Sequence, residues 1–202
     1  MKKIPLSFFQ HDDVLALSRA LIGKYLFTCL APENSVTGGM IIETEAYRGI
    51  EDKASHAYNN RRTKRTETMF SSGGTAYVYF CYGIHHLFNI VTNIKDVPHA
   101  VLIRAIIPEV GIDVMLQRRN KEKVIPTLTA GPGSLCRALG ITKAHDGLTL
   151  NGSAIWLEDR GLDIPAEHIL TSPRIGVDYA GEDALKPWRF YLDPKYLNPS
   201  ED

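Results

Sequence analysis

The sequence lacks several features that would place it in a class at once. Its 202 residues hold 23 Lys and Arg against 23 Asp and Glu, so it carries no net charge. A balanced chain has no general attraction to a polyanion, so any nucleic-acid contact must come from a local basic face. No apolar run approaches the roughly 20 residues of a membrane span, which excludes a spanning helix. We find no internal repeat and no low-complexity segment, so the chain is not a repeat array.

Cysteine is scarce, and its placement excludes familiar metal and disulfide frameworks. Cys29, Cys81 and Cys136 are odd in number and lack metal-ligand spacing, so we expect reduced thiols in an intracellular protein. The apolar stretch after Met1 is too short and too soon interrupted for a signal peptide. Because no His-Glu-x-x-His, Cys-x-x-Cys or P-loop pattern occurs, we expect a cytoplasmic protein with no metal and no cofactor.

What is present is enough apolar sequence for one core. The hydrophobic fraction is 44%, which suits a single domain over residues 1–202. Strand-like and helix-like segments follow one another irregularly and not as βαβ units, which favours an α+β fold on a curved, mostly antiparallel sheet with surrounding helices. The expected strands are 24–30, 39–47, 75–81, 85–92, 99–107, 154–157, 168–170, 174–177 and 189–192. The expected helices are 12–22, 51–58, 66–70, 109–118 and 132–139.

The segment 41–47 places acidic and aromatic side chains in an apolar strand. Positions two apart share a strand face, so Glu43, Glu45 and Tyr47 would line one wall while Thr44 and Ala46 face away. An unpaired buried charge is costly, so the two carboxylates need a reason. A general base that activates water is one explanation, and a solvent-facing strand edge with salt bridges is another. The spacing also allows a paired-carboxylate glycosidase, and it does not settle which carboxylate acts.

The segments 75–81 and 85–92 predict a protruding β-hairpin with Tyr82 at its tip. Gly83 suits a tight turn with positive φ. A tyrosine at a tip cannot be buried in its own core, so it is an interaction anchor or a wedge between base steps. Tyr77 and Tyr79 share a strand face, and sheet packing is the ordinary explanation for each, although one could line the same cavity as Tyr47.

Two further features are compatible with phosphate contacts. Arg61, Arg62, Lys64 and Arg65 place four positive charges within five residues, and a second basic cluster spans 118–123. Solvated loops are the usual explanation for such clusters, but in a neutral chain the local concentration makes DNA-backbone contact plausible. Gly131 and Gly133, in the stretch 129–134, could offer backbone N–H groups to a phosphate at a helix start.

Together these residues suggest chemistry on a flat, uncharged group removed from a stack, as when a nucleobase is flipped out of DNA. On the same residues the chain resembles the alkyladenine (3-methyladenine) DNA glycosylase family of vertebrate and bacterial type, over nearly its whole length. The motifs that carry the resemblance are Glu43-Thr44-Glu45-Ala46-Tyr47, Glu51-Asp52-x-Ala54-x-His56, the basic connection 61–69, Tyr77-Val78-Tyr79-x-x-Tyr82-Gly83 with Asn89, Val101-Leu102-Ile103-Arg104-Ala105, Gly131-Pro132 and Arg174-Ile175-Gly176-Val177.

The resemblance implies a catalytic group of three residues. Glu45 would be the general base that orients and deprotonates the attacking water. Arg104 and the main-chain carbonyl of Ile175 would help to hold that water. No lysine is evident beside Glu45 for a Schiff base, so we expect a monofunctional glycosylase that leaves an abasic site.

The resemblance also implies roles around the flipped base. Tyr47, Tyr79 and His56 would enclose the base, with His56 giving a hydrogen bond to its edge. Asn89 would lie at the pocket floor and could reject the amino group of normal guanine. Tyr82 would intercalate through the minor groove into the gap left by the flipped nucleotide.

The expected partner is double-stranded DNA that contains damaged purines: 3-methyladenine, 7-methylguanine, hypoxanthine or ethenoadenine. We expect a monomer with no obligate protein partner and no membrane association. Two other functions stay open at this point. A non-catalytic nucleic-acid-binding module of the same fold would have no use for Glu45. A small-molecule glycosidase or nucleosidase would be indifferent to Tyr82.

Overall fold

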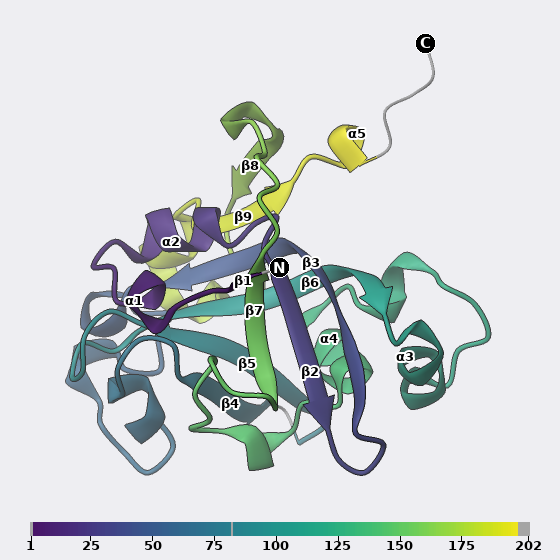
Figure 1. The fold of residues 1–202 in the computed structure, drawn as a ribbon. Coiled ribbons are helices and arrows are strands. Elements are labelled where there is room, and N and C mark those ends of the chain that lie inside the picture. Colours follow the sequence, from purple (N-terminus) through teal and green to yellow (C-terminus); the bar gives the residue numbers. More distant parts are fainter. Residues whose placement is uncertain (1, 82, 198–202) are drawn as a thin grey trace.

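The structure is a computed structural model that describes residues 2–81 and 83–197. Its central strand is β3 (Ser35–Tyr47), which pairs along most of its length with β6 (His99–Val110) (Figure 1). On its other edge, β2 (Tyr25–Leu30) pairs with the first part of β3, and β9 (Arg189–Leu192) pairs with Glu43–Glu45. The strand that carries the two predicted carboxylates is therefore bordered on both edges.

The remaining strands extend one antiparallel sheet in the order β1-β7-β2-β3-β6-β5-β4, with β8 added beside β9. Within the described ranges every strand pair is antiparallel. The order along the chain is not βαβ, so the predicted α+β class and mostly antiparallel sheet are confirmed. The bounds of these strands are Lys2–Lys3 for β1, Ala76–Cys81 for β4, His85–Thr92 for β5, Ile155–Asp159 for β7 and Ile169–Ser172 for β8.

The described residues contain five α-helices, of which α1 and α2 lie on the left of Figure 1, α4 and α3 lie to the right of its centre, and α5 stands away from the sheet near the C-terminus. Helix α2 lies within the expected helix 12–22 and begins after Asp13, whose carboxylate caps it by accepting the backbone N–H groups of Leu15 and Ala16 at 2.9 and 3.0 Å. Helices α2 and α4 both contribute to the main apolar core with the sheet. The bounds are Leu6–Phe9 for α1, Val14–Ala20 for α2, Ile112–Arg119 for α3, Pro132–Leu139 for α4 and Pro194–Leu197 for α5.

Short 3-10 helices occupy many of the connections. The predicted helix at 66–70 is one of these single-turn elements, and the predicted helix at 132–139 is α4. The 3-10 helices are Gly49–Glu51 (η1), Tyr58–Asn60 (η2), Glu67–Phe70 (η3), Pro126–Leu128 (η4), Lys143–His145 (η5), Ala166–His168 (η6) and Asp178–Leu185 (η7).

The main differences between the predicted elements and the structure lie in three segments. The helix expected at 109–118 starts later, because β6 continues to Val110 opposite Gly38 and Gly111 then takes a left-handed φ of 69°. The strand expected at 174–177 is a loop, since Arg174 turns inward instead of pairing. The stretch 51–58 is mainly turns, in which the Asp52 carboxylate accepts the Ala54 N–H at 3.0 Å.

The alternation predicted for β3 is reproduced. The Thr44 hydroxyl is buried against Ser18 of α2, at 2.9 Å. The neighbouring Glu45 points the other way, toward Tyr47 and the loop that carries Ile175. One face of the strand therefore belongs to the core, and the opposite face holds polar groups.

Strands β4 and β5 pair from Ala76 opposite Ile90 to Cys81 opposite His85, as a hairpin requires. Gly83 has the predicted positive φ, 70°. Tyr82, the predicted intercalating residue, lies outside the described residues. Its neighbour Ile84 is 70% exposed, so an apolar side chain is presented to solvent beside the tip.

Candidate active site

The Glu45 carboxylate is fully buried but well supplied with hydrogen-bond donors. Its Oε2 accepts the Tyr47 hydroxyl at 2.8 Å. Its Oε1 accepts the Ile175 N–H at 2.7 Å and lies 3.3 Å from Nη1 of Arg104. These donors come from β3, from β6 and from a loop near the end of the chain, so the fold assembles the site from three separate segments.

Glu43, the other predicted carboxylate, has a different environment. Its Oε1 accepts Nε of Arg104 at 2.8 Å and Nε of Arg189 at 2.6 Å. Two guanidinium groups thus share one carboxylate oxygen. Arg104 lies between the two acids and contacts both, while Glu43 fixes its orientation.

Burial dominates the electrostatics of Glu45. Loss of solvent raises the pKa of this carboxyl, and the nearby Glu43 raises it further. The positive charge of Arg104, the Ile175 N–H and the Tyr47 hydroxyl act in the opposite direction, without cancelling the rise. A raised carboxylate pKa beside fixed hydrogen-bond donors is typical of groups that take part in proton transfer.

A cavity of about 930 Å³ opens in front of this carboxylate. Its size is within the range of ligand pockets, about 300–1,000 Å³. Tyr77 lines it as well as the predicted residues. The predicted site residues that line it are Tyr47, His56, Arg61, Arg65, Tyr79, Asn89, Arg104, Gly131, Gly133 and Ile175.

Of the predicted site residues that the structure describes, three do not line the cavity: Glu45, Arg62 and Lys64. Glu45 itself is too deeply buried to line the cavity, but Tyr47, Arg104 and Ile175 both line it and contact the carboxylate. Arg62 and Lys64 are not among the lining residues.

The aromatic walls are held by their own contacts. The rings of His56 and Tyr79 meet edge to face with centroids 4.6 Å apart, and those of Tyr77 and Tyr79 lie 5.6 Å apart. The Tyr77 hydroxyl and His56 Nδ1 are hydrogen-bonded at 2.9 Å, so the imidazole is fixed in place. Asn89 is buried beside them and donates from its side-chain amide to the Tyr77 carbonyl at 3.1 Å.

The rings of His56, Tyr47 and Tyr79 in the cavity wall are uncharged near neutral pH. Burial, with help from the charges of Arg65 and Arg61, lowers the pKa of His56 to about 4. Burial likewise raises the pKa of Tyr47 and of Tyr79, so both keep their phenolic protons. The site therefore offers neutral rings beside one buried carboxylate.

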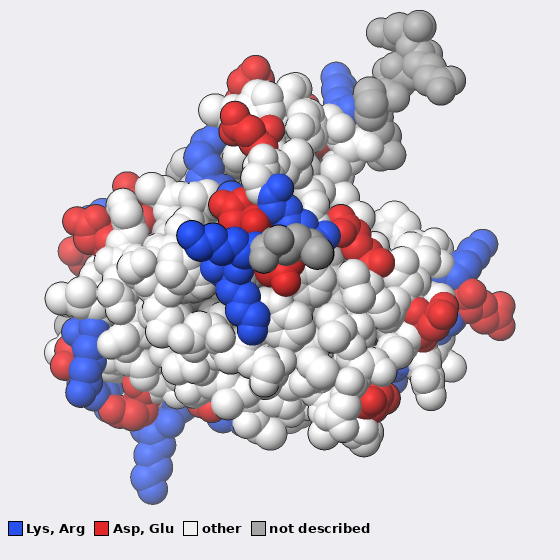
Figure 2. Space-filling view, viewed as in Figure 1, with Lys and Arg blue, Asp and Glu red and all other residues white. Residues whose placement is uncertain are grey.

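The predicted basic segment divides into two parts. Arg62 forms ion pairs with Glu67 at 2.6 Å and Asp96 at 2.7 Å. Arg65 instead lies over the ring of Tyr79, 5.5 Å from its centroid, at the cavity. On the face drawn in Figure 2, basic and acidic side chains are interspersed around a broad uncharged area, so that face carries no continuous basic stripe.

The start of α4 reaches the same cavity. Gly131 has a positive φ of 88°, and Pro132 occupies the first turn of the helix. Gly133 packs so closely on His85 of β5 that a Cβ there would lie 2.8 Å from the ring. Gly131 therefore satisfies a backbone requirement, and Gly133 allows the helix to approach the hairpin.

The described residues contain neither a candidate metal-binding cluster nor a membrane-spanning helix. Among the described residues, no cluster of three or more His, Cys, Asp or Glu could hold a metal ion. The three cysteines are free thiols, and only Cys136 is fully buried. None of the helices in the described ranges has the length and apolar character of a membrane span.

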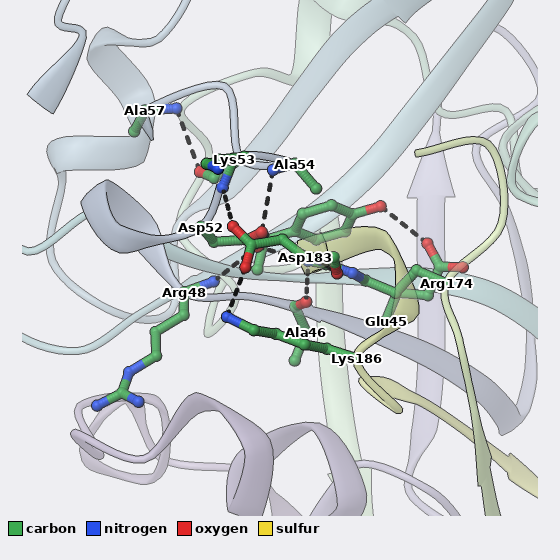
Figure 3. Close-up of polar contacts among 12 residues, drawn as sticks. Glu45, Ala46, Arg48, Asp52, Lys53, Ala54, Ala57, Arg174, Asp183 and Lys186 are labelled. Carbon is green, nitrogen blue, oxygen red and sulfur yellow. Dashed lines mark hydrogen bonds and ion pairs between the residues drawn. The ribbon is translucent and has the colours of Figure 1, made fainter. Parts of the chain in front are cut away.

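Sequence reasoning gave no role to several charged residues that support the site. No pattern in the sequence singles out Arg189, although it pairs with Glu43. Asp52 and Arg174 form a fully buried ion pair, and they were noted only within motifs (Figure 3). A charged residue in an apolar segment is the available signal, but it does not identify the partner.

The fold and the cavity define an enzyme-type site in which tyrosine and histidine rings line a cavity beside a buried carboxylate. Comparisons with known proteins agree that the chain is an enzyme. The sequence model of the family described as "Methylpurine-DNA glycosylase (MPG)" matches residues 7–195. The chain therefore belongs to the methylpurine-DNA glycosylase family. It is a DNA glycosylase, an enzyme that hydrolyses N-glycosyl bonds.

Three bacterial relatives, each named "Putative 3-methyladenine DNA glycosylase", are similar over almost their full lengths. The protein of Chlamydia felis (strain Fe/C-56) is 50% identical, covering 95% of this chain and 97% of the relative. That of Chlamydia pneumoniae is 47% identical, over 93% and 94%. That of Desulfitobacterium hafniense (strain Y51) is 42% identical, over 98% and 99%. The family resemblance expected from the motifs is confirmed.

Proposed function

We propose that this DNA glycosylase excises alkylated or deaminated purines from double-stranded DNA by attack of a Glu45-activated water, leaving an abasic site. The observation that carries the proposal is the buried Glu45 carboxylate, held by three residues that also line an aromatic-walled cavity. The substrates are those of the family resemblance: 3-methyladenine, 7-methylguanine, hypoxanthine and ethenoadenine. The bacterial relatives support a cytoplasmic site of action.

The contacts of Glu45 suit a general base better than those of Glu43. The Glu45 Oε2, which accepts the Tyr47 hydroxyl, keeps a second lone pair for a water. Glu43 is instead held by Arg104 and Arg189, which suits an orienting role. Arg104 and the backbone of Ile175 lie close enough to Glu45 to bracket the same water. The carboxylate would also stabilise the positive charge that develops on the sugar.

The cavity walls support recognition of an electron-poor purine. Tyr47, Tyr79 and His56 present neutral rings, and a cation over an aromatic face gains about 0.5–2 kcal/mol. Because the pKa of His56 is about 4, this imidazole is neutral and can exchange hydrogen bonds with a base edge, but it is not a ready proton donor. Asn89 lines the same cavity, where it can exclude the amino group of guanine.

Duplex contacts are assigned to the hairpin and the basic segment. Tyr82 would fill the gap left by the flipped nucleotide. Arg61 and Arg65 line the cavity, where they can meet the flanking phosphates, and Lys64 is exposed beside them. The backbone at Gly131 and Gly133 offers a further contact at the helix start. No protein partner is needed for these contacts, so we propose that the enzyme acts as a monomer.

The test is release of free base from duplex oligonucleotides that each contain one lesion, with a chelator present and an optional alkali step. We expect release from at least one damaged purine, with strand breaks only after alkali. Glu45→Gln should bind the same duplex but lose excision by orders of magnitude. Tight duplex binding with no release from any lesion would favour a binding module. Activity on free nucleosides that is indifferent to Tyr82→Ala would favour a nucleosidase.

A further inference from the structure

A buried ion pair behind the cavity has no part in the chemistry described so far. Asp52 and Arg174 lie 122 residues apart in sequence, and both side chains are fully buried. Nη1 of Arg174 donates to Oδ2 of Asp52, and Nη2 donates to Oδ1 at 2.9 Å, so the contact is two-pronged (Figure 3). Burial alone lowers the pKa of Arg174, but the bonds to Asp52 raise it overall, so the guanidinium stays charged.

The Arg174 side chain joins the structural parts that form the site. Nη1 also donates to the Ala46 carbonyl of β3 at 2.9 Å, and Nη2 donates to the Asp183 carbonyl of η7 at 3.1 Å. Its guanidinium carbon lies 4.8 Å from the ring centroid of Tyr47 and 5.0 Å from that of Trp188. The residue after Arg174 is Ile175, whose N–H bonds Glu45.

Asp52 anchors the other side of the cavity. Its carboxylate accepts the backbone N–H of Ala54 at 3.0 Å and that of Arg48 at 3.3 Å. These bonds shape the turn that leads from β3 to His56. The Asp183 carboxylate accepts the Lys53 N–H at 2.9 Å, which ties the same turn to η7.

Stability alone is a poor explanation for this pair. Replacing a buried ion pair by apolar residues of similar size is often neutral or stabilising, because both charges are costly to desolvate. A two-pronged pair does, however, fix the relative position of two loops more narrowly than apolar packing does. The loops in question are the one that carries Ile175 and the one that carries His56.

We propose that Asp52 and Arg174 are positioning residues, whose ion pair joins these two loops and holds the Ile175 N–H and the Tyr47 ring in place against Glu45. The inference rests on the proposed function, because it assigns Glu45 as the base. A misplacement of about 1 Å can cost on the order of 100-fold in rate. The pair thus acts on the reaction through other residues and touches no substrate.

The test uses Asp52→Leu/Arg174→Met, which removes both charges together and leaves no buried ion. Glu109→Leu/Arg160→Met is the control, at a partly exposed ion pair whose Arg160 also contacts Glu158 at 3.4 Å. Arg160 also pairs with Glu109, at 3.0 Å, and lies over two rings, those of Tyr25 and Phe27, without lining the cavity. Each variant is compared with the wild type in melting temperature, single-turnover excision against pH, lesion-duplex Kd and hydrogen exchange of the Ile175 amide.

We expect the double variant to fold, with faster exchange at Ile175 and a rate loss on the order of 100-fold, but with little change in Kd. The acid limb of its pH profile should move to higher pH, because Glu45 loses an N–H that favours its charged form. The other groups that face Glu45 are Arg104, Glu43, Tyr47 and the Arg174 charge itself, whose loss acts in the same direction. The control should keep the wild-type rate and acid limb.

A folded double variant with wild-type rate, acid limb and Ile175 exchange would overturn the proposal. So would a rate loss that the control matches. If the double variant does not fold, Arg174→Lys, which keeps the charge but not the two-pronged geometry, undergoes the same measurements with the same expected directions. A wild-type protein that releases no base would contradict the proposed function, while the exchange of Ile175 would still test the ion pair.

Discussion

At the residue scale, the ionised form of Glu45 that the proposed reaction needs is also the form that destabilises the folded protein. Its raised pKa means that the folded protein favours the protonated carboxyl, so ionised Glu45 destabilises the fold at pH values above that pKa. Glu45→Gln removes the charge and can still accept the Ile175 N–H. We therefore expect the variant to melt at a temperature no lower than the wild type at pH 7, with the difference shrinking as the pH falls. Calorimetry at several pH values measures this, and a clearly lower melting temperature at pH 7 would contradict it.

The pH dependence of excision follows from the same group. A general base must be ionised, so the rate should fall as the pH drops through the pKa of Glu45. Because burial raises this pKa above the ordinary 4.5, the acid limb should lie at higher pH than for a solvent-exposed glutamate. Single-turnover rates across the acidic range give the midpoint. A limb at or below 4.5 would show that another group limits the rate or that Glu45 is not the base.

Whether the sequence predicts a residue's contacts depends on how far apart the two partners lie along the chain. Alternation along one strand is enough to place Glu45 and Tyr47 on the same face, and the structure joins them by a 2.8 Å hydrogen bond. The Asp52–Arg174 pair could not be predicted in this way, because its partners lie on loops far apart in the chain. The support of Glu43 by Arg189 is unpredictable for the same reason.

At the scale of elements, the hairpin can be tested through its tip. Tyr82→Ala should weaken binding to a lesion duplex and slow excision, because no ring then fills the gap left by the flipped base. Val124→Ala is a control at an exposed apolar side chain that does not line the cavity. Equilibrium binding and single-turnover excision separate the two effects. Unchanged excision by Tyr82→Ala would remove the wedge from the mechanism.

The basic segment gives a prediction about salt. Lys64→Ala and Arg61→Ala should weaken binding to damaged and undamaged duplexes alike, and should flatten the dependence of log K on log salt by about 0.9 for each phosphate that the variant no longer neutralises. Arg62→Ala should change the slope less, because Arg62 already forms ion pairs with two carboxylates of the protein. Titrations at several salt concentrations measure the slopes. Equal flattening by all three variants would mean that DNA displaces the internal partners of Arg62.

Element boundaries were predictable where local chemistry decides them. Asp13 caps α2 and Gly83 takes the left-handed turn, as the residue types require. The boundary between β6 and α3 was misplaced, because pairing of Val110 with Gly38 extends the strand through residues whose pattern also suits a helix. The alternating 174–177 looked like a strand, but the contacts of Arg174 prevent pairing. Both differences come from tertiary contacts that no local pattern contains.

At the scale of the whole molecule, one sheet and one main core should unfold together. The two tryptophans report on distant parts, since Trp156 lies in β7 and Trp188 packs beside Arg174. Single-tryptophan variants, Trp156→Phe and Trp188→Phe, should give the same denaturant midpoint by fluorescence and by circular dichroism, after correction for the stability change of each substitution. Midpoints that differ between the two probes of one variant would divide the chain into separate folding units.

The position of β3 affects how the enzyme would lose activity on heating. This strand carries Glu45 and Tyr47, and it is also the strand bordered by β2, β6 and β9. Many enzymes lose activity before they unfold, because their reactive groups lie on loops that loosen first. Here the base is attached to the innermost strand, so its own anchorage should last as long as the fold. Early heat inactivation would then point to the loops around the cavity, which a ligand in the cavity could protect.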